Sequence, residues 1–203
     1  MSARPGERKD QILQVLAQML EEPRAVKITT AALAAHLRVS EAALYRHFAS
    51  KAQMFEGLIE FIEATLFGLI NKLTEEEKSA IRQIEGILSL LLGFAKKNPG
   101  LTRVLIGDAL TNENDRLQTR INQLHDRLEA TLRQALRFGV SEGEIARDAD
   151  TSAHANMLMC YVTGRWHQFA KSGYKHDPME YWEAQRRELL SSEAFIVRVP
   201  ATD

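Results

Sequence analysis

The sequence predicts an all-α fold of about nine helices, with a small N-terminal head and a larger helical body. Apolar residues recur at spacings of three and four along most of the 203 residues. Glycine, proline and short polar segments separate these stretches, as expected for loops between helices. No stretch shows the alternation of a half-buried β-strand. We therefore predict a head in residues 1–51, a body in residues 52–191 and a loose tail in residues 192–203.

The head begins with an amphipathic helix over residues 7–20 and continues with two short helices joined by a tight turn. The second and third helices lie in residues 29–51, TTAALAAHLRVSEAALYRHFASK. Thr29 and Ser40 are suited to cap them, because a side-chain oxygen can accept a hydrogen bond from a free N–H of the first turn. Two helices arranged in this way can place the second in the major groove of DNA.

The predicted third helix has small and polar residues on its outward side. Ala42 and Ala43 allow a close approach to base edges, whereas Tyr45, Arg46 and Lys51 can donate to phosphates. Residues 1–51 also hold eight Lys and Arg against five Asp and Glu, although the whole chain has a net charge of −1. The alternative to a DNA-binding unit is an ordinary helical hairpin with a basic surface. The predicted DNA-binding residues are Thr29, Thr30, Ser40, Glu41, Ala42, Ala43, Tyr45, Arg46, His47 and Lys51.

The body is predicted to contain six helices. Asn98-Pro99-Gly100 ends the second of them, because the residue before proline avoids the helical region and glycine favours helix ends. Gly139 and Gly143 are expected to frame a loop, and Asp177 to cap a helix that has Pro178 at its first position. The predicted ranges are 51–73, 81–97, 101–110, 115–137, 151–171 and 178–190.

Composition excludes several classes of protein. Cys160 is the single cysteine, which excludes an intramolecular disulfide, and its apolar neighbours predict that it is buried. We expect no signal peptide, no membrane span and a cytoplasmic protein. The six histidines show no metal-ligand spacing, and His125 is expected on a solvated helix face. Without a phosphate loop or nucleophile motif, we expect no cofactor, no metal and no enzymatic activity.

The stretch LAAHLRVSEAALYRHFASKAQMF resembles the DNA-binding domain of the TetR family. Members of that family are homodimers with an N-terminal helix-turn-helix head, so the resemblance implies a dimer on a palindromic DNA site. The chain departs from the family at two positions. Arg38 stands where glycine is usual in the turn, and a residue other than glycine at positive φ costs about 1 kcal/mol. Ala49 stands where proline is common.

The body resembles the nucleoid-occlusion branch of the same family through MFEGLIEFIEATL, LLLGFAKKNPGLTRVLIGDAL and DRLQTRINQLHDRLEATLRQ. This resemblance implies a nucleoid-associated factor that binds the C-terminal tail of the division GTPase FtsZ and inhibits division-ring assembly over the chromosome. The alternative function is a ligand-responsive transcriptional repressor of the TetR family.

The resemblance also implies a groove for the FtsZ tail between two body helices. Lys97 stands where the family has arginine, so bidentate hydrogen bonding to a carboxylate is lost. Leu69 stands where a basic residue is expected. The alternative reading is that the apolar members are core residues. The matching positions are Phe61, Leu90, Gly93, Lys97 and Asn98.

Aromatic and methionine side chains gather on the last two predicted helices. Such enrichment is typical of protein interfaces, and the family dimerises through this region. Ordinary core packing is the alternative explanation. The predicted interface residues are Met157, Tyr161, Trp166, Phe169 and Trp182.

Overall fold

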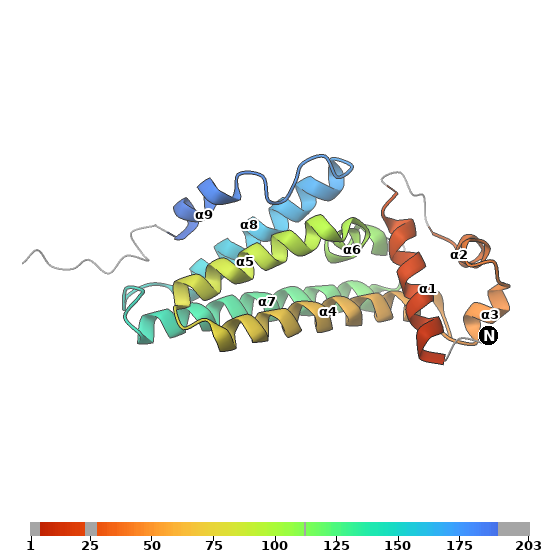
Figure 1. Ribbon diagram of the computed structural model, residues 1–203, viewed down its shortest axis with the longest axis horizontal. Coiled ribbons are helices and arrows are strands. Elements are labelled where there is room, and N and C mark those ends of the chain that lie inside the picture. The colour runs from red at the N-terminus through yellow and green to blue at the C-terminus, as the bar shows by residue number, and fades with distance from the viewer. Residues whose placement is uncertain (1–4, 23–27, 112, 191–203) are drawn as a thin grey trace, which may run out of the picture.

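The computed structural model describes residues 5–22, 28–111 and 113–190, and the regular structure in these ranges is entirely helical. Figure 1 shows an elongated body with the head at one end. The predicted tail, residues 192–203, lies outside the described residues. The head contains α1 (Pro5–Leu20), α2 (Thr30–His36) and α3 (Glu41–Tyr45). The body contains α4 (Lys51–Glu76), α5 (Ala80–Lys97), α6 (Pro99–Leu105), the 3₁₀ helix η1 (Asp108–Leu110), α7 (Asp115–Ser141), α8 (Thr151–Lys171) and α9 (Trp182–Leu190).

The body is built around contacts among four long helices. α4 packs on α5 and α7, and α8 packs on α5 and α7. Leu88, Leu91 and Leu128 are wholly buried in this core. Trp166 of α8 is also wholly buried, and its indole N–H donates to the Leu91 carbonyl oxygen at 3.1 Å. The ring of this tryptophan is therefore packed within the chain, and its polar N–H has a hydrogen-bond partner there.

Two predicted helix boundaries in the middle of the body are wrong. The helix predicted over 101–110 is interrupted, because Gly107 adopts a left-handed conformation with φ of 75° between α6 and η1. Gly139 lies inside α7 instead of in a loop. A Cβ atom at Gly139 would lie closer than 3.0 Å to the side chain of Ile145, so this glycine permits close packing against the returning chain.

The start of the last helix also differs from the prediction. Asp177 does act as a cap, since its side chain accepts from the backbone N–H of Met179 at 2.8 Å, but it caps a turn. Tyr181 has a positive φ of 68°, and α9 begins only at Trp182. The prediction that Asp177 acts as a cap is therefore confirmed, but the helix begins at residue 182 and not at the predicted residue 178.

Two single-residue predictions need correction. Cys160 is exposed on α8 rather than buried, because its neighbours Leu158, Met159 and Val162 take the inward positions. His125 is not solvated. Its ring lies 5.8 Å from the Trp166 ring, and its Nε2 is buried without a hydrogen-bond partner in the described ranges. Burial lowers the pKa of His125, against the opposing effect of a hydrogen bond with the Leu105 backbone.

The head is joined to the body through close packing of α1 on α6. Gly100, at the start of α6, is buried against α1. A Cβ atom there would lie closer than 3.0 Å to the backbone carbonyl oxygen of Ala17. Backbone atoms cannot move aside as the end of a flexible side chain can. Glycine is therefore required at this point for the two helices to meet as they do.

We predict that Gly100→Ala destabilises the protein by about 1–3 kcal/mol, because the added methyl group overpacks the α1–α6 contact. Thermal or urea unfolding measures this effect. Gly68→Ala is the matched control, since a Cβ atom at Gly68 has no neighbour within 4 Å. Alanine at that helical position should be neutral or stabilising by about 0.5–1 kcal/mol. Equal stability of the two variants would contradict the prediction.

A carboxylate from a distant loop caps the N-terminus of α5. Glu144 accepts hydrogen bonds from the Ser79 hydroxyl at 2.7 Å and from the backbone N–H groups of Ala80 and Ile81 at 2.9 and 3.2 Å. Burial raises the pKa of the Glu144 carboxyl, but these hydrogen bonds and the charge of Arg82 outweigh it, so the pKa lies below its ordinary value of 4.5. The cap joins the α7–α8 loop to α5.

We predict that Glu144→Gln lowers stability by about 1 kcal/mol near neutral pH, as expected for loss of a charged helix cap. Because the pKa is lowered by folding, the contribution of Glu144 is fully present above pH 4.5 and is lost as the pH falls through the folded-state value. Unfolding curves of both proteins from pH 7 to pH 3 measure the difference. A difference that stays constant down to pH 3 would show that the carboxylate charge has no part in it.

Candidate DNA interface and partner groove

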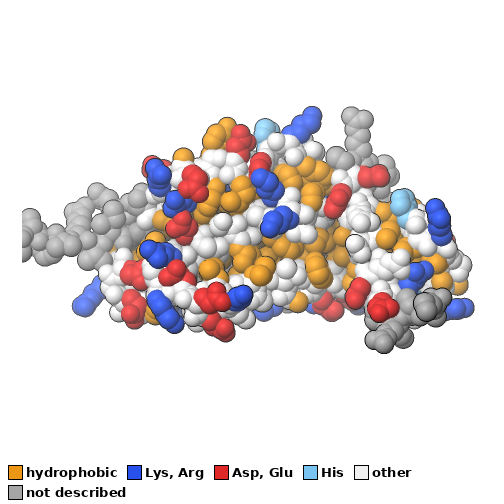
Figure 2. All heavy atoms as spheres, viewed as in Figure 1, with side chains coloured by type: hydrophobic (Ala, Val, Ile, Leu, Met, Phe, Trp, Pro, Cys, Tyr) orange, Lys and Arg blue, Asp and Glu red, His pale blue; other side chains and the backbone are white. Residues whose placement is uncertain are grey.

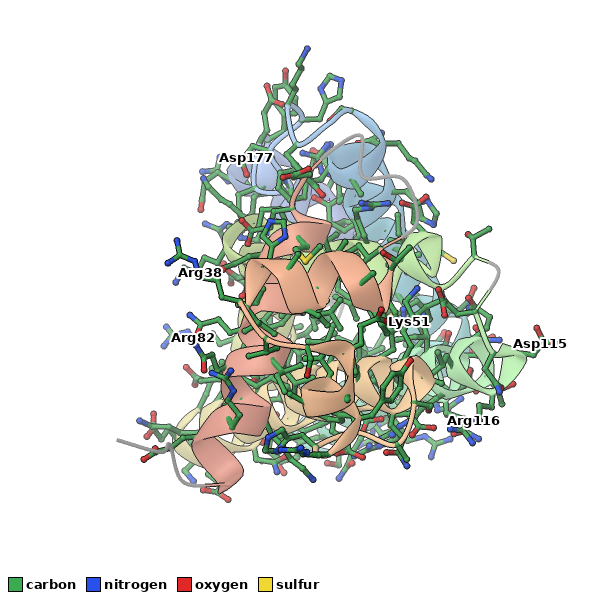
Figure 3. All side chains as sticks on the ribbon, turned by 90° about the vertical axis from the view of Figure 1, so that its right-hand side faces the viewer. Arg38, Lys51, Arg82, Asp115, Arg116 and Asp177 are labelled. Atoms are coloured by element: carbon green, nitrogen blue, oxygen red, sulfur yellow. The ribbon has the colours of Figure 1, made fainter. Side chains whose placement is uncertain are left out.

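The two short helices of the head are capped as predicted. The Thr29 hydroxyl accepts from the backbone N–H of Ala32 at 3.1 Å, and the Ser40 hydroxyl accepts from that of Ala43 at 3.3 Å. Leu44 of α3 is buried in the core of the head. Arg38, in the turn between α2 and α3, has a φ of 54°, so the turn keeps the left-handed geometry without glycine. Its side chain is exposed and points outward at the edge of Figure 3.

The surface of α3 offers small and hydrogen-bonding groups to a partner. Ala42 and Arg46 are exposed, Tyr45 is 46% exposed, and Ala43 and His47 are half-buried. This pattern has the features needed to approach base edges and hold phosphates.

Two predicted DNA-binding residues contact each other instead of standing free. The Thr30 hydroxyl donates to a Glu41 carboxylate oxygen at 2.6 Å and thereby joins α2 to α3. In the free protein both side chains support the position of α3.

Lys51 is held by the body. Its Nζ lies 2.5 Å from the Glu113 carboxylate, and the two side chains are only 18% and 11% exposed. The ammonium group also lies 5.5 Å from the centre of the Phe55 ring. Figure 3 shows Lys51 within the outline of the molecule, unlike Arg38. A phosphate contact at Lys51 therefore requires exchange of Glu113 for the phosphate, which sequence reasoning did not foresee.

The residues matched to the partner groove lie along α4 and α5, which are neighbours in the body. Phe61 is 53% exposed, and Leu90 and Asn98 are half-buried. Lys97 is exposed and has no ion pair with another described residue. A Cβ atom at Gly93 would have no neighbour within 4 Å, so the backbone of α5 is open there. These residues are not simply core.

The same face is largely apolar. Leu69 is 48% exposed on α4, although a basic residue was expected at this position. Figure 2 shows apolar side chains gathered over this side of the body, next to the head. Contiguous exposed apolar surface is a common feature of interaction sites.

A pocket of about 450 Å³ lies where the groove meets the head. Phe61 and Asn98 belong both to the predicted groove and to this pocket. Sequence reasoning missed its α1 wall. These residues recur at helical spacing beside the main apolar face of α1, which shows that they share one side of the helix. The spacing does not show which part of the body that side faces. The wall consists of Asp10, Leu13, Gln14, Ala17, Gln18 and Glu21.

The predicted dimer residues divide into two groups. Trp166 is wholly buried within the chain, and Phe169 and Trp182 are 4% and 5% exposed. These three have almost no surface left for a partner, so their large rings serve the core of the body. Met157 is 41% exposed, and Tyr161 is half-buried and donates to Gln185 at 2.8 Å.

The described residues show neither a metal cluster nor a membrane-spanning helix. No group of three or more His, Cys, Asp or Glu side chains among them is placed to hold a metal ion. No helix within those ranges has the length and apolar character needed to cross a membrane.

Comparisons with known proteins agree with the architecture. Residues 25–58 match the bacterial regulatory proteins of the tetR family, and residues 78–193 match the tetracyclin repressor-like C-terminal domain. A TetR transcriptional regulator from Chloroflexus aurantiacus superposes with a TM-score of 0.78 at 17% identity, covering 95% of this chain and 98% of its own. The fatty acid degradation regulator FadR from Bacillus halodurans gives 0.76 at 16%, with 97% and 100% covered. The fold is that of a TetR-type regulator.

Curated relatives are much closer in sequence. The nucleoid occlusion factor SlmA of Alteromonas mediterranea is 53% identical over 88% of this chain and 91% of its own. SlmA of a Marinomonas species is 48% identical, with 91% and 94% covered. The chain belongs to the SlmA family of nucleoid occlusion factors.

We predict that Arg38→Gly stabilises the protein by about 1 kcal/mol, because glycine adopts the positive φ of this turn without a clash of Cβ. Chemical unfolding measures the change. Arg38→Ala is the control, since it removes the guanidinium and keeps the strained Cβ. If both variants gain the same stability, the gain comes from the loss of charge and not from relief of backbone strain.

Proposed function

We propose that the protein binds a palindromic DNA site as a homodimer, binds the C-terminal tail of FtsZ, and thereby inhibits division-ring assembly over the nucleoid. The observation that carries this proposal is that a member of the SlmA family exposes both an α3 surface suited to DNA and an apolar groove on its body. The two surfaces lie on different elements, so one chain can engage both partners at once.

The DNA contact is proposed to centre on α3. Ala42 and Ala43 permit close approach to base edges, while Tyr45 and Arg46 donate to phosphates. Arg38, exposed beside them, adds positive charge at the same surface. The phosphate contacts fix the position of the helix, and the small residues permit it to enter the groove.

The partner contact is proposed to lie in the groove of α4 and α5. Phe61 and Leu69 supply exposed apolar surface, and Lys97 supplies a cation for an acidic residue of the tail. Gly93 lets an extended peptide approach the α5 backbone. Leu69 takes the place of a basic residue, so the groove has one cation, Lys97, where the family has two. We therefore expect tail binding to depend more on apolar contact and to be less sensitive to salt concentration than in a groove with two cations.

The dimer contact is proposed to use the outward face of α8. Met157 and Cys160 are exposed on this face, and a Cβ atom at Gly164 would have no neighbour within 4 Å. Small side chains allow two copies of a helix to approach each other closely. About a two-fold axis, the same surface of both chains forms the interface.

The proposal is tested with full-length protein, a palindromic DNA fragment and a labelled FtsZ tail peptide. Tyr45→Ala should weaken DNA binding about tenfold for any sequence and leave peptide binding unchanged. Phe61→Ala should weaken peptide binding and leave DNA binding unchanged, because it removes apolar contact from the groove. Tyr181→Ala is the control for both, since Tyr181 is 64% exposed and lies on the body after α8.

Failure of the wild-type protein to bind the peptide at high micromolar concentration would overturn the proposal. Release of the DNA by a small apolar compound, without any peptide binding, would favour a ligand-responsive repressor instead.

A further inference from the structure

Lys51, the first residue of α4, is paired with a carboxylate of the body in the free protein. Its Nζ lies 2.5 Å from Glu113, and the two side chains are only 18% and 11% exposed. The ammonium group also lies 5.5 Å from the centre of the Phe55 ring. Salt screens a partly buried pair of this kind much less than an exposed one. A second anion that approaches this ammonium group must therefore compete with Glu113.

The place of Lys51 in the chain brings it next to the surface proposed to bind DNA. α3 ends at Tyr45, and α4 begins at Lys51. A lysine ammonium is a point charge on a flexible four-carbon stem, so it can turn from a carboxylate to a phosphate without movement of the backbone. Both partners are anions, and Lys51 can be paired in the free and in the DNA-bound protein.

Further ion pairs hold α4 on α7 without Lys51. Arg116 of α7 lies 2.8 Å from Glu56 of α4, and Arg120 reaches two more carboxylates of α4 at 3.1 and 3.3 Å. The two helices also pack on each other in the body. The position of α4 therefore does not depend on the Lys51–Glu113 pair alone, and the ammonium group can leave Glu113 while the helices stay together.

Glu113 loses its partner when Lys51 leaves. It lies in the connection between η1 and α7, where its backbone N–H donates to the Leu110 carbonyl oxygen at 2.9 Å. Lys51 is the one cation paired with its carboxylate in the described ranges. Removal of one member of a partly buried ion pair leaves a charge that is poorly compensated, which costs free energy. A phosphate contact at Lys51 therefore carries a cost that Glu113 sets.

We propose that Glu113 is an internal competitor of the DNA phosphate for Lys51, and that it weakens the binding of every DNA sequence by the same factor. A phosphate contact carries no sequence information, so the competition acts on a palindromic site and on unrelated DNA alike. Binding to unrelated DNA depends almost wholly on phosphate contacts, so the pair helps to release the protein from such DNA. This inference rests on the DNA-binding part of the proposed function and is independent of the FtsZ tail.

The competition is tested with Glu113→Gln in the full-length protein, a palindromic duplex that wild type binds and a scrambled duplex of the same length. The variant should bind both duplexes about fivefold more tightly and keep the ratio of the two affinities. Asp115→Asn is the charge-matched control, because Asp115 is exposed, lies close to Glu113 in the chain and has no ion pair with another described residue. Figure 3 shows it on the same side of the view as Lys51. Its affinities should stay within about twofold of wild type.

The gain requires Lys51, so it must disappear when the ammonium group is removed. In a Lys51→Ala background, Glu113→Gln should change both affinities by less than about twofold. Lys51→Ala should also weaken DNA binding more in the Glu113→Gln protein than in wild type, since no competitor then opposes the phosphate contact. Thermal unfolding confirms that each variant is folded, and Glu113→Ala must give the same gain as Glu113→Gln.

Three results would overturn the inference. An equal gain in Asp115→Asn, or a gain that persists in the Lys51→Ala background, would show that only general repulsion of the DNA was removed. Unchanged affinity of folded Glu113→Gln, while wild type binds the duplexes, leaves the proposed function standing and removes the competition. If wild type binds neither duplex, the DNA-binding part of the proposed function and the inference fail together.

Discussion

The packing of α1 on α6 is the contact on which the arrangement of both candidate sites depends. Gly100 allows the backbone of α6 to meet the carbonyl of Ala17 at a distance that no Cβ would permit. The last turn of α1 is then held by the body, because Arg103 and Tyr174 donate to the Leu20 carbonyl oxygen at 3.3 and 3.0 Å. These bonds satisfy a carbonyl that a helix end leaves free. They position the head and, at the same time, build one wall of the pocket.

Charge pairs join the segments of the body next to this junction. Lys51 at the start of α4 is paired with Glu113 before α7, and Arg103 is paired with Asp108 at 2.8 Å. Asp108 also binds Lys171 of α8. Burial raises the pKa of Asp108, but the hydrogen bonds from Lys171 and Arg103 outweigh it, so its pKa lies below the ordinary value. A DNA phosphate that reached Lys51 would compete with a contact that belongs to the body.

Much of the fold followed from local rules. The periodic apolar pattern predicted the long helices, and α8 has the predicted bounds. The caps at Thr29 and Ser40 are local hydroxyl-to-backbone contacts, so they could be predicted from residue type alone. The two short helices of the head followed for the same reason. Errors arose at Gly139, Tyr181 and His125, where distant segments determine whether a residue lies in a helix, a turn or the core.

The sequence by itself therefore determined the helical class and the helix-turn-helix head, because these depend on spacings within single helices. The groove residues were matched by resemblance to the family and stay a prediction. Tertiary structure decided which side of each helix remains exposed. It buried Trp166 and left Cys160 at the surface, although both belong to one helix. It also brought residues of α1, such as Leu13 and Ala17, into one pocket with Phe61 of α4. No local pattern contains this proximity, because it depends on the close approach of α1 to the body at Gly100.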